Sequence, residues 1–212
     1  MIRLSNLVLN KYVPLVDKMM KESGDKSCPI WLLVNPKYPV VRDDIWNPIL
    51  DKIQDAVYRK LRKRIDTRNI FIKNVSSDIG IVPNPLNLRA VEITKEIAIL
   101  RESVFENNPK ILITFGKITY EFVRRVLEIS PEEGPKYWST ANLGDEFERS
   151  ITNFDINQTN KIPLPGRVVR GGKSIKDREY SSWEDSENYF RDIGTKIADR
   201  IIENKDDLKI WI

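Results

Sequence analysis

Histidine is absent from the 212 residues of the sequence, and cysteine occurs once, as Cys28. Histidine is the commonest metal ligand and the usual general base near neutral pH, so histidine-based metal sites and catalytic triads are excluded. A single thiol excludes an internal disulfide and cannot supply the several thiolates of an iron–sulfur cluster. We therefore expect no metal and no cofactor, and any catalysis must use carboxylates, amides, hydroxyls or water.

Long hydrophobic runs are absent as well. No stretch reaches the roughly 18 apolar residues that a membrane-spanning helix needs, and the start of the chain lacks the pattern of a secretory signal. We therefore expect a cytoplasmic protein with no membrane partner. Hydrophobic residues form 41% of the chain, which is enough for the core of one domain. Residues 1–212 are accordingly predicted to form a single domain, and we expect a monomer.

Neither sign of charge is in large excess. The formal net charge is +4, which permits a nucleic-acid partner without demanding one. A basic cluster at 59–64 is interpreted as a solvated helix end, where cations are common. The loop 165–178 is more suggestive, because it contains one carboxylate and five cations, which can hold phosphate groups but can also be a solvated surface. Those cations are Arg167, Arg170, Lys173, Lys176 and Arg178.

The clearest secondary-structure pattern lies near the middle of the chain. Residues 111–115 are a short apolar run that ends at Gly116 and predicts a buried strand. After this glycine the apolar residues Ile118, Phe122 and Val126 recur every four positions, which predicts a helix. A helix that begins directly after a buried strand points its first N–H groups toward the crevice in which α/β proteins bind ligands.

Similar patterns predict the remaining elements. Further strands are expected at 29–34, 69–75 and 161–164, and further helices at 5–23, 44–64, 88–107 and 183–204. The segment 132–160 has a weak pattern and is interpreted as an insertion that holds short strands or a packed loop. Strands that alternate with helices predict a mainly parallel sheet. The predicted fold class is therefore α/β, a three-layer α/β/α sandwich with a central, mainly parallel four-stranded sheet.

The carboxyl ends of parallel strands meet at one edge of a sheet, so Asn35, Asn74, Gly116 and the loop 165–178 are expected to gather there. Side-chain amides can hydrogen-bond a neutral heterocycle or orient a water, and cations can hold a phosphate. This edge is therefore predicted to bind a nucleotide base with its backbone. Each asparagine also has a structural interpretation, because Asn35 before Pro36 can open a turn and Asn74 can cap the next loop.

Three of these segments resemble the uracil-DNA glycosylase superfamily, in the same order along the chain. In its mismatch-specific and single-strand-selective branches the first motif is Gly-hydrophobic-Asn-Pro-Gly, and the similar segment here is Leu33-Val34-Asn35-Pro36-Lys37. Asn74 lies at the end of the second predicted strand, where the superfamily has an asparagine that reads the flipped base. Residues 109–117 are similar to a segment of Pro-Lys, about four hydrophobic residues and Gly.

Two departures from that superfamily concern the chemistry. Both glycines of the first motif are replaced, by Leu33 and Lys37, and bulky side chains there could fill a base pocket. The last motif of the superfamily typically reads His-Pro-Ser, whereas the segment in its place here reads Leu164-Pro165-Gly166-Arg167. We therefore expect base excision to be slow or undetectable.

The resemblance implies a DNA-repair hydrolase that cleaves the N-glycosidic bond of a damaged or deaminated base in DNA. It implies that Asn35 is catalytic and orients the water, and that Asn74 binds the base. Tyr38 and Trp46 are candidates to stack on that base. The phosphates of the DNA would be held by Gly166, Arg167, Arg170, Lys173 and Lys176.

Two alternatives remain open. The first is a catalytically inactive protein on the same fold that binds a nucleic acid or a nucleotide. The second is a nucleotide-processing enzyme on a Rossmann-like sheet, which is disfavoured because no glycine-rich phosphate loop follows any predicted strand.

Overall fold

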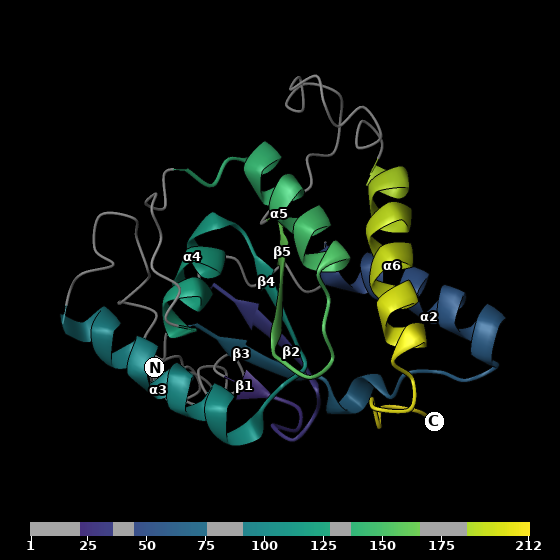
Figure 1. The fold of residues 1–212 in the computed structure, drawn as a ribbon, viewed down its shortest axis with the longest axis horizontal. Helices are drawn as coiled ribbons and strands as arrows, with labels where there is room; N and C mark the ends of the chain where they lie inside the picture. Colours follow the sequence, from purple (N-terminus) through teal and green to yellow (C-terminus); the bar gives the residue numbers. More distant parts are fainter. Residues whose placement is uncertain (1–21, 36–44, 76–90, 128–136, 166–185) are drawn as a thin grey trace, which may run out of the picture.

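The computed structural model describes residues 22–35, 45–75, 91–127, 137–165 and 186–212, and within them five strands form one sheet with helices around it (Figure 1). The strands are β1 (Glu22–Ser23), β2 (Ile30–Val34), β3 (Phe71–Asn74), β4 (Ile111–Phe115) and β5 (Asn160–Leu164). The α-helices are α2 (Asn47–Leu61), α3 (Val91–Asn107), α4 (Lys117–Val126), α5 (Thr140–Thr152) and α6 (Ser186–Glu203), and a 3-10 helix, η2, spans Thr67–Asn69.

The sheet has the strand order β1-β3-β2-β4-β5. The strands β2, β3, β4 and β5 run parallel, which confirms the prediction of a mainly parallel α/β sheet. Val34 lies beside Asn74 in one strand pair, and Leu33 lies beside Thr114 in another. The predicted number of four strands is wrong, because β1 adds a fifth strand that runs antiparallel to β3.

The edge strand β1 occupies the last two positions of the predicted helix 5–23, and the rest of that helix lies outside the described residues. Gly24 follows β1 with a φ of 87°, a left-handed conformation that favours glycine. A Cβ atom at Gly24 would lie 2.1 Å from the carbonyl oxygen of Ile70. The left-handed turn and this close approach of two backbones explain why Glu22 and Ser23 pair with β3 rather than extend a helix.

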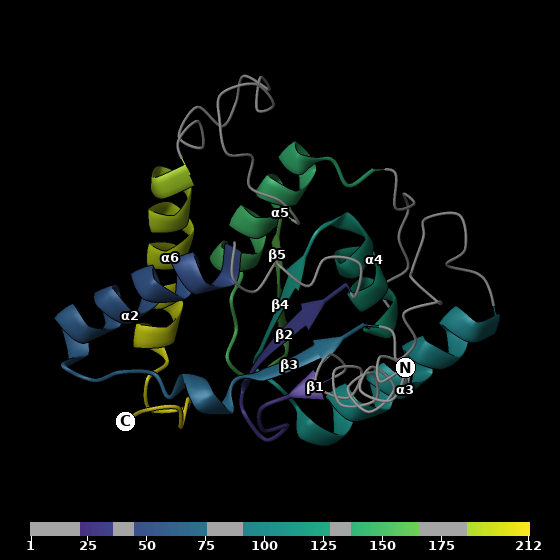
Figure 2. The same cartoon turned by 180° about the vertical axis from the view of Figure 1, so that it is seen from behind.

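Helices cover both faces of the sheet. The helices α2 and α6 lie over one face and α3 and α4 lie over the other, as Figure 1 and the reverse view in Figure 2 show. Along β2, Ile30 and Leu32 join the core cluster under α2 and α6, whereas Trp31 and Leu33 join the cluster under α3 and α4. In the second cluster Trp31 packs edge-on against Phe71, with 4.7 Å between the ring centroids. This alternation is what a strand covered on both faces requires.

The helices α2 and α6 cross at very short range. A Cβ atom at Gly194 of α6 would lie 2.6 Å from Cβ of Lys52 and 3.0 Å from the carbonyl oxygen of Ile49. A glycine at this position therefore lets the two helix backbones touch. The buried face of α2 is formed by Ile49, Ile53 and Val57, whose spacing of four is that of an amphipathic helix.

The interpretation of 132–160 as short strands or a packed loop is wrong for residues 140–152, which form α5. Ser139 caps this helix, since its Oγ accepts a hydrogen bond from Asn142 N at 3.1 Å. Leu143, Phe147 and Ile151 are buried and recur every four residues. The helical spacing is thus present in the sequence, but polar residues lie between these positions and weaken the apolar pattern. In the structure α5 packs along β5 (Figure 1).

The other predicted elements that fall on described residues are confirmed, with ends that differ by a few residues. The predicted strand 69–75 corresponds to β3 and the predicted strand 161–164 corresponds to β5. The predicted helix 183–204 corresponds to α6. Within the described ranges, no helix combines the length and the apolar composition that crossing a lipid bilayer requires.

Candidate functional site

The order of the parallel strands defines where a ligand is expected. From β2 the chain passes outward to β3, and then returns past β2 to β4 and β5 on the other side. The direction of strand addition therefore reverses between β2 and β4. In open α/β sheets, ligands bind in the crevice outside the carboxyl ends of the strands at such a switch point. The residues that follow β2 and β4 are Asn35 and Gly116.

Gly116 joins β4 to α4 with no intervening loop. Its φ of 84° and ψ of 161° fall in a region that is essentially restricted to glycine. Its N–H donates to the carbonyl oxygen of Leu164 at 2.7 Å, and its own carbonyl accepts from Tyr120 N at 3.0 Å. These bonds fix the start of α4 at the carboxyl edge of the sheet. The partial positive charge of a helix N-terminus therefore lies at the switch point, where it favours anionic groups.

Two hydroxyl groups near this turn are buried without a partner. Thr114 Oγ1 in β4 and Thr119 Oγ1 in the first turn of α4 have no hydrogen bond to any described residue. Their side chains are 0% and 1% exposed. A buried hydroxyl that lacks a partner typically costs about 1–3 kcal/mol, so such groups are uncommon in native proteins and call for an explanation. Both of them lie within three residues of Gly116.

The structure places Asn35 and Asn74 at the same edge of the sheet, at the ends of two neighbouring strands. Val75 N donates to the carbonyl oxygen of Val34 at 3.0 Å, which holds the two chain segments together just where the strands end. Asn35 is 3% exposed and Asn74 is 6% exposed. Two buried amide side chains therefore lie at the carboxyl edge of the sheet, Asn35 at the switch point and Asn74 on the neighbouring strand, and neither is a solvated loop residue.

The other predicted site residues are distributed differently. Trp46 is 3% exposed and belongs to the core cluster under α2 and α6, together with Ile49 and Ile53. Stacking on a base would require this side chain to leave the core, so its contribution in the structure is to packing. All of the remaining predicted site residues lie outside the described part of the chain. They are Tyr38, Gly166, Arg167, Arg170, Lys173 and Lys176.

A buried polar network that the sequence did not predict lies beside the site, on α4. Its centre is Glu121, which is 0% exposed. One carboxylate oxygen accepts from Arg125 Nε at 3.1 Å, and the other accepts from Trp138 Nε1 at 3.1 Å and from Arg124 Nη1 at 3.5 Å. The guanidinium of Arg124 also lies 4.9 Å from the ring centroid of Trp138. In the sequence, these ion pairs are indicated only by the spacing of the residues, since Arg124 and Arg125 follow Glu121 by three and four positions on one helix.

The network continues into α5 through Tyr120. The Tyr120 hydroxyl donates to Glu146 Oε1 at 2.6 Å, and Arg149 Nη1 donates to Glu146 Oε2 at 2.7 Å. Burial, and then the hydrogen bond to Glu146, raises the pKa of Tyr120 well above its ordinary value. Tyr120 therefore remains a neutral donor. Because these bonds join α4 to α5, they hold the helix that begins at the switch point.

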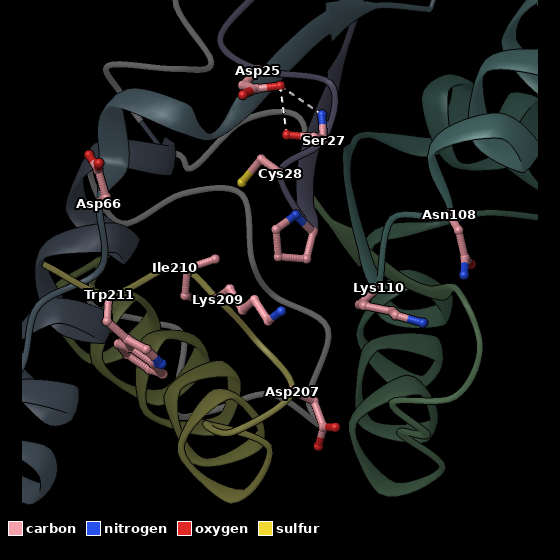
Figure 3. Close-up of a pocket in the computed structure, with 11 residues that line it drawn as sticks. Asp25, Ser27, Cys28, Asp66, Asn108, Lys110, Asp207, Lys209, Ile210 and Trp211 are labelled. Carbon is pink, nitrogen blue, oxygen red and sulfur yellow. Dashed lines mark hydrogen bonds between the residues drawn. The ribbon is translucent and has the colours of Figure 1, made fainter.

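A separate cavity of about 460 Å³ lies at the opposite, amino edge of the sheet (Figure 3). Cys28 lies there between the turn that contains Asp25 and Ser27 and the C-terminal segment that carries Lys209 and Trp211. Burial raises the pKa of the Cys28 thiol, so the thiol is protonated and a poor nucleophile near neutral pH. Ligands of α/β sheets bind at the carboxyl edge, so this cavity is not the main candidate.

Comparison of the chain with protein-family models and with curated proteins gives no match. Among the described residues, no cluster of three or more acidic or cysteine side chains is arranged to hold a metal ion. The candidate site is therefore defined by its own geometry, which combines two buried amides, a glycine turn and a helix N-terminus.

Proposed function

We propose that the protein is a DNA N-glycosylase of the uracil-DNA glycosylase type, which removes a damaged or deaminated base by hydrolysis. The observation that carries this proposal is the position of Asn35, a buried amide at the switch point of the parallel sheet, beside the start of α4. The resemblance of residues 33–37 to the first glycosylase motif gives this position its role.

In the proposed reaction the base is extruded from the DNA and enters the carboxyl edge of the sheet. The side-chain oxygen of Asn35 accepts a hydrogen bond from a water and directs the oxygen of that water at the sugar carbon C1′. As the C1′–O bond forms, the C1′–N bond breaks and its electron pair leaves with the base. The attacking water releases one of its protons to solvent and leaves a hydroxyl group on C1′, while the base departs as an anion and takes up a proton from solvent. The products are the free base and an abasic sugar. Asn74 would hydrogen-bond the polar edge of the base.

The departing base anion needs stabilisation that histidine does not supply in this chain. The first N–H groups of α4 offer partial positive charge at the same edge of the sheet, and the cations of 165–178 are a second candidate source. Bases that are good leaving groups would therefore be favoured as substrates.

A second candidate function is binding of DNA or a nucleotide without chemistry. It is favoured by the absence of histidine from the chain and of any carboxylate from residues 33–38. A positioned general base typically contributes roughly 10²–10⁴-fold to a rate, so a site that orients water without deprotonating it would be slow. Leu33 does not decide between the two functions, because its side chain is 0% exposed in the core cluster under α3 and α4.

Release of free base from oligonucleotides distinguishes the two functions. We expect slow release of uracil or hypoxanthine from single- or double-stranded DNA by the wild-type protein, and its loss in Asn35→Ala, because the water is no longer oriented. The matched control is Asn107→Ala, at the end of α3 near the amino edge, where the amide donates to Ser103 O at 2.8 Å. Excision that persists in Asn35→Ala would overturn the proposed site, and no release by the folded wild type favours the second function.

The glycosylase function, and the second function where its ligand is DNA, predict DNA binding that weakens as salt rises, because cations that contact phosphates release counterions from the DNA. Charge reversal of Arg167, Arg170 and Lys173 to Glu should weaken binding of a fluorescent oligonucleotide and reduce the slope of log K against log salt by about 1 for each lost contact.

The control for that variant makes the same change in charge at the end of α2. Arg62, Lys63 and Arg64 are exposed there and form no ion pair with any described residue. Charge reversal at these three positions should leave most of the affinity intact. Equal losses in the two triple variants would show that net charge alone, and not the loop 165–178, determines the affinity.

A further inference from the structure

A polar groove lies on the side of the molecule where the last turns of α5 meet the beginning of β5. Its volume is about 210 Å³, and its lining side chains are all polar or charged. Three of them come from α5 (Glu146, Arg149 and Ser150) and two from β5 (Asn160 and Lys161), and the turn between these elements supplies Asn153, Gln158 and Thr159. This groove is distinct from the carboxyl edge of the sheet, because Lys161 lies near the amino end of β5.

Lys161 is the unusual member of this set. It is half-buried, and its ammonium group forms no hydrogen bond or ion pair with any residue that the structure describes. Burial lowers the pKa of Lys161, the nearby carboxylate of Glu146 raises it, and the charges of Arg124 and Arg149 lower it. Glu146 forms no hydrogen bond with the ammonium group, so this partly desolvated cation has no direct acceptor among the described residues.

The carboxylates nearby are already engaged. Both oxygens of Glu146 accept hydrogen bonds, one from Tyr120 and one from Arg149. The two oxygens of Glu121 are shared by Arg124, Arg125 and Trp138. Lys161 is therefore the cation for which this cluster provides no hydrogen-bonded acceptor.

We propose that this groove binds a small oxyanion, the phosphate monoester or carboxylate group of a small molecule. The ammonium group of Lys161 would be the principal contact, and the guanidinium of Arg149, whose side chain is 67% exposed, would be the second. The groove favours a small ligand over a polymer, because its volume is below that of a typical drug-sized pocket, roughly 300–1,000 Å³. This inference does not depend on the proposed glycosylase function.

The test uses the full-length protein with inorganic phosphate and, separately, acetate, at an ionic strength kept constant with sodium chloride. A ligand that binds only the folded state raises the thermal midpoint in a saturable manner. We expect at least one of the two anions to do so, and to shift the backbone amide resonances of Arg149 and Lys161. The anion that raises the thermal midpoint shows whether the ligand group is a phosphate or a carboxylate.

Substitutions test whether the anion that raises the thermal midpoint binds in the groove. Lys161→Gln should weaken anion binding about tenfold or more, since a hydrogen bond to a charged group is worth roughly 1.5–3 kcal/mol. Lys196→Gln is the control, because Lys196 already pairs with Glu148 at 2.6 Å and should not contribute. Glu146→Gln keeps an acceptor for Tyr120 and removes the competing negative charge, so it should tighten binding.

Four results would overturn the inference. The first three are a thermal shift that chloride reproduces at equal ionic strength, unchanged binding by Lys161→Gln, and weaker binding by a folded Glu146→Gln protein. Displacement of phosphate from the groove by a short oligonucleotide would also overturn it, because the groove would then belong to a nucleic-acid surface.

Discussion

Uracil release should become faster, by roughly 10²-fold or more, when Asn35 is replaced by aspartate. The reason is that a carboxylate at this position can deprotonate the water that the amide only orients, and a general base typically contributes about 10²–10⁴-fold. The position is 3% exposed, so desolvation should raise the pKa of the new carboxyl group above its ordinary value. Its active form is the deprotonated one, and excision by Asn35→Asp should therefore increase as pH rises through that raised pKa.

Single-turnover release of uracil between pH 5 and pH 9 measures this effect. Asn107→Asp is the matched control, because it makes the same substitution at the end of α3 near the amino edge of the sheet, where no attacking water is expected. Circular dichroism establishes that each variant is folded. A folded Asn35→Asp protein that is no faster than wild type at any pH would remove Asn35 from the proposed mechanism.

Replacement of Glu121 by alanine should lower the free energy of unfolding by about 3–5 kcal/mol, because the loss of one partner leaves buried charges without compensation. Glu121 is 0% exposed, and its removal leaves Arg124, Arg125 and the indole N–H of Trp138 without the carboxylate that accepts their hydrogen bonds. Arg124 is held at 15% side-chain exposure and cannot simply turn into solvent. Urea denaturation followed by tryptophan fluorescence gives the change in free energy directly.

Glu148→Ala provides the comparison. Glu148 pairs with Lys196 at 2.6 Å, but its side chain is 41% exposed, so its loss should cost at most about 1 kcal/mol. Both variants remove a carboxylate, but the expected losses of stability differ because Glu121 is buried and Glu148 is exposed. A loss below about 1 kcal/mol in Glu121→Ala would show that the network on α4 rearranges without cost.

The parts of the fold that could be predicted are those encoded locally. The strand at 111–115 and the helix after Gly116 follow from an apolar run, a glycine and a spacing of four, all within a few neighbouring residues. The two-residue strand β1 could not be predicted, because two residues carry no periodicity. It is positioned instead by the left-handed turn at Gly24 and by pairing with β3, which lies far away in the chain.

The residues of the candidate site could likewise be predicted only where a local sequence pattern positions them. Asn35 and Asn74 could be placed at one edge because each follows a strong strand pattern and parallel strands end together. The partners of Glu121 could be predicted only in part. Two of them are on the same helix, but Trp138 reaches Glu121 through the packing of α5 against α4, which no local pattern records. The buried position of Trp46 likewise depends on the distant helix α6.

The close crossing of α2 and α6 at Gly194 also constrains the order of events during synthesis. The apolar face of α2 emerges from the ribosome before α6, which covers it, has been made. Contacts between segments so distant in sequence form late in folding, because the chain between them must first be ordered. We therefore expect the half of the core formed by β2, β4, α3 and α4 to collapse first. Until α6 arrives, the nascent chain presents Ile49, Ile53 and Val57 as a surface for chaperones.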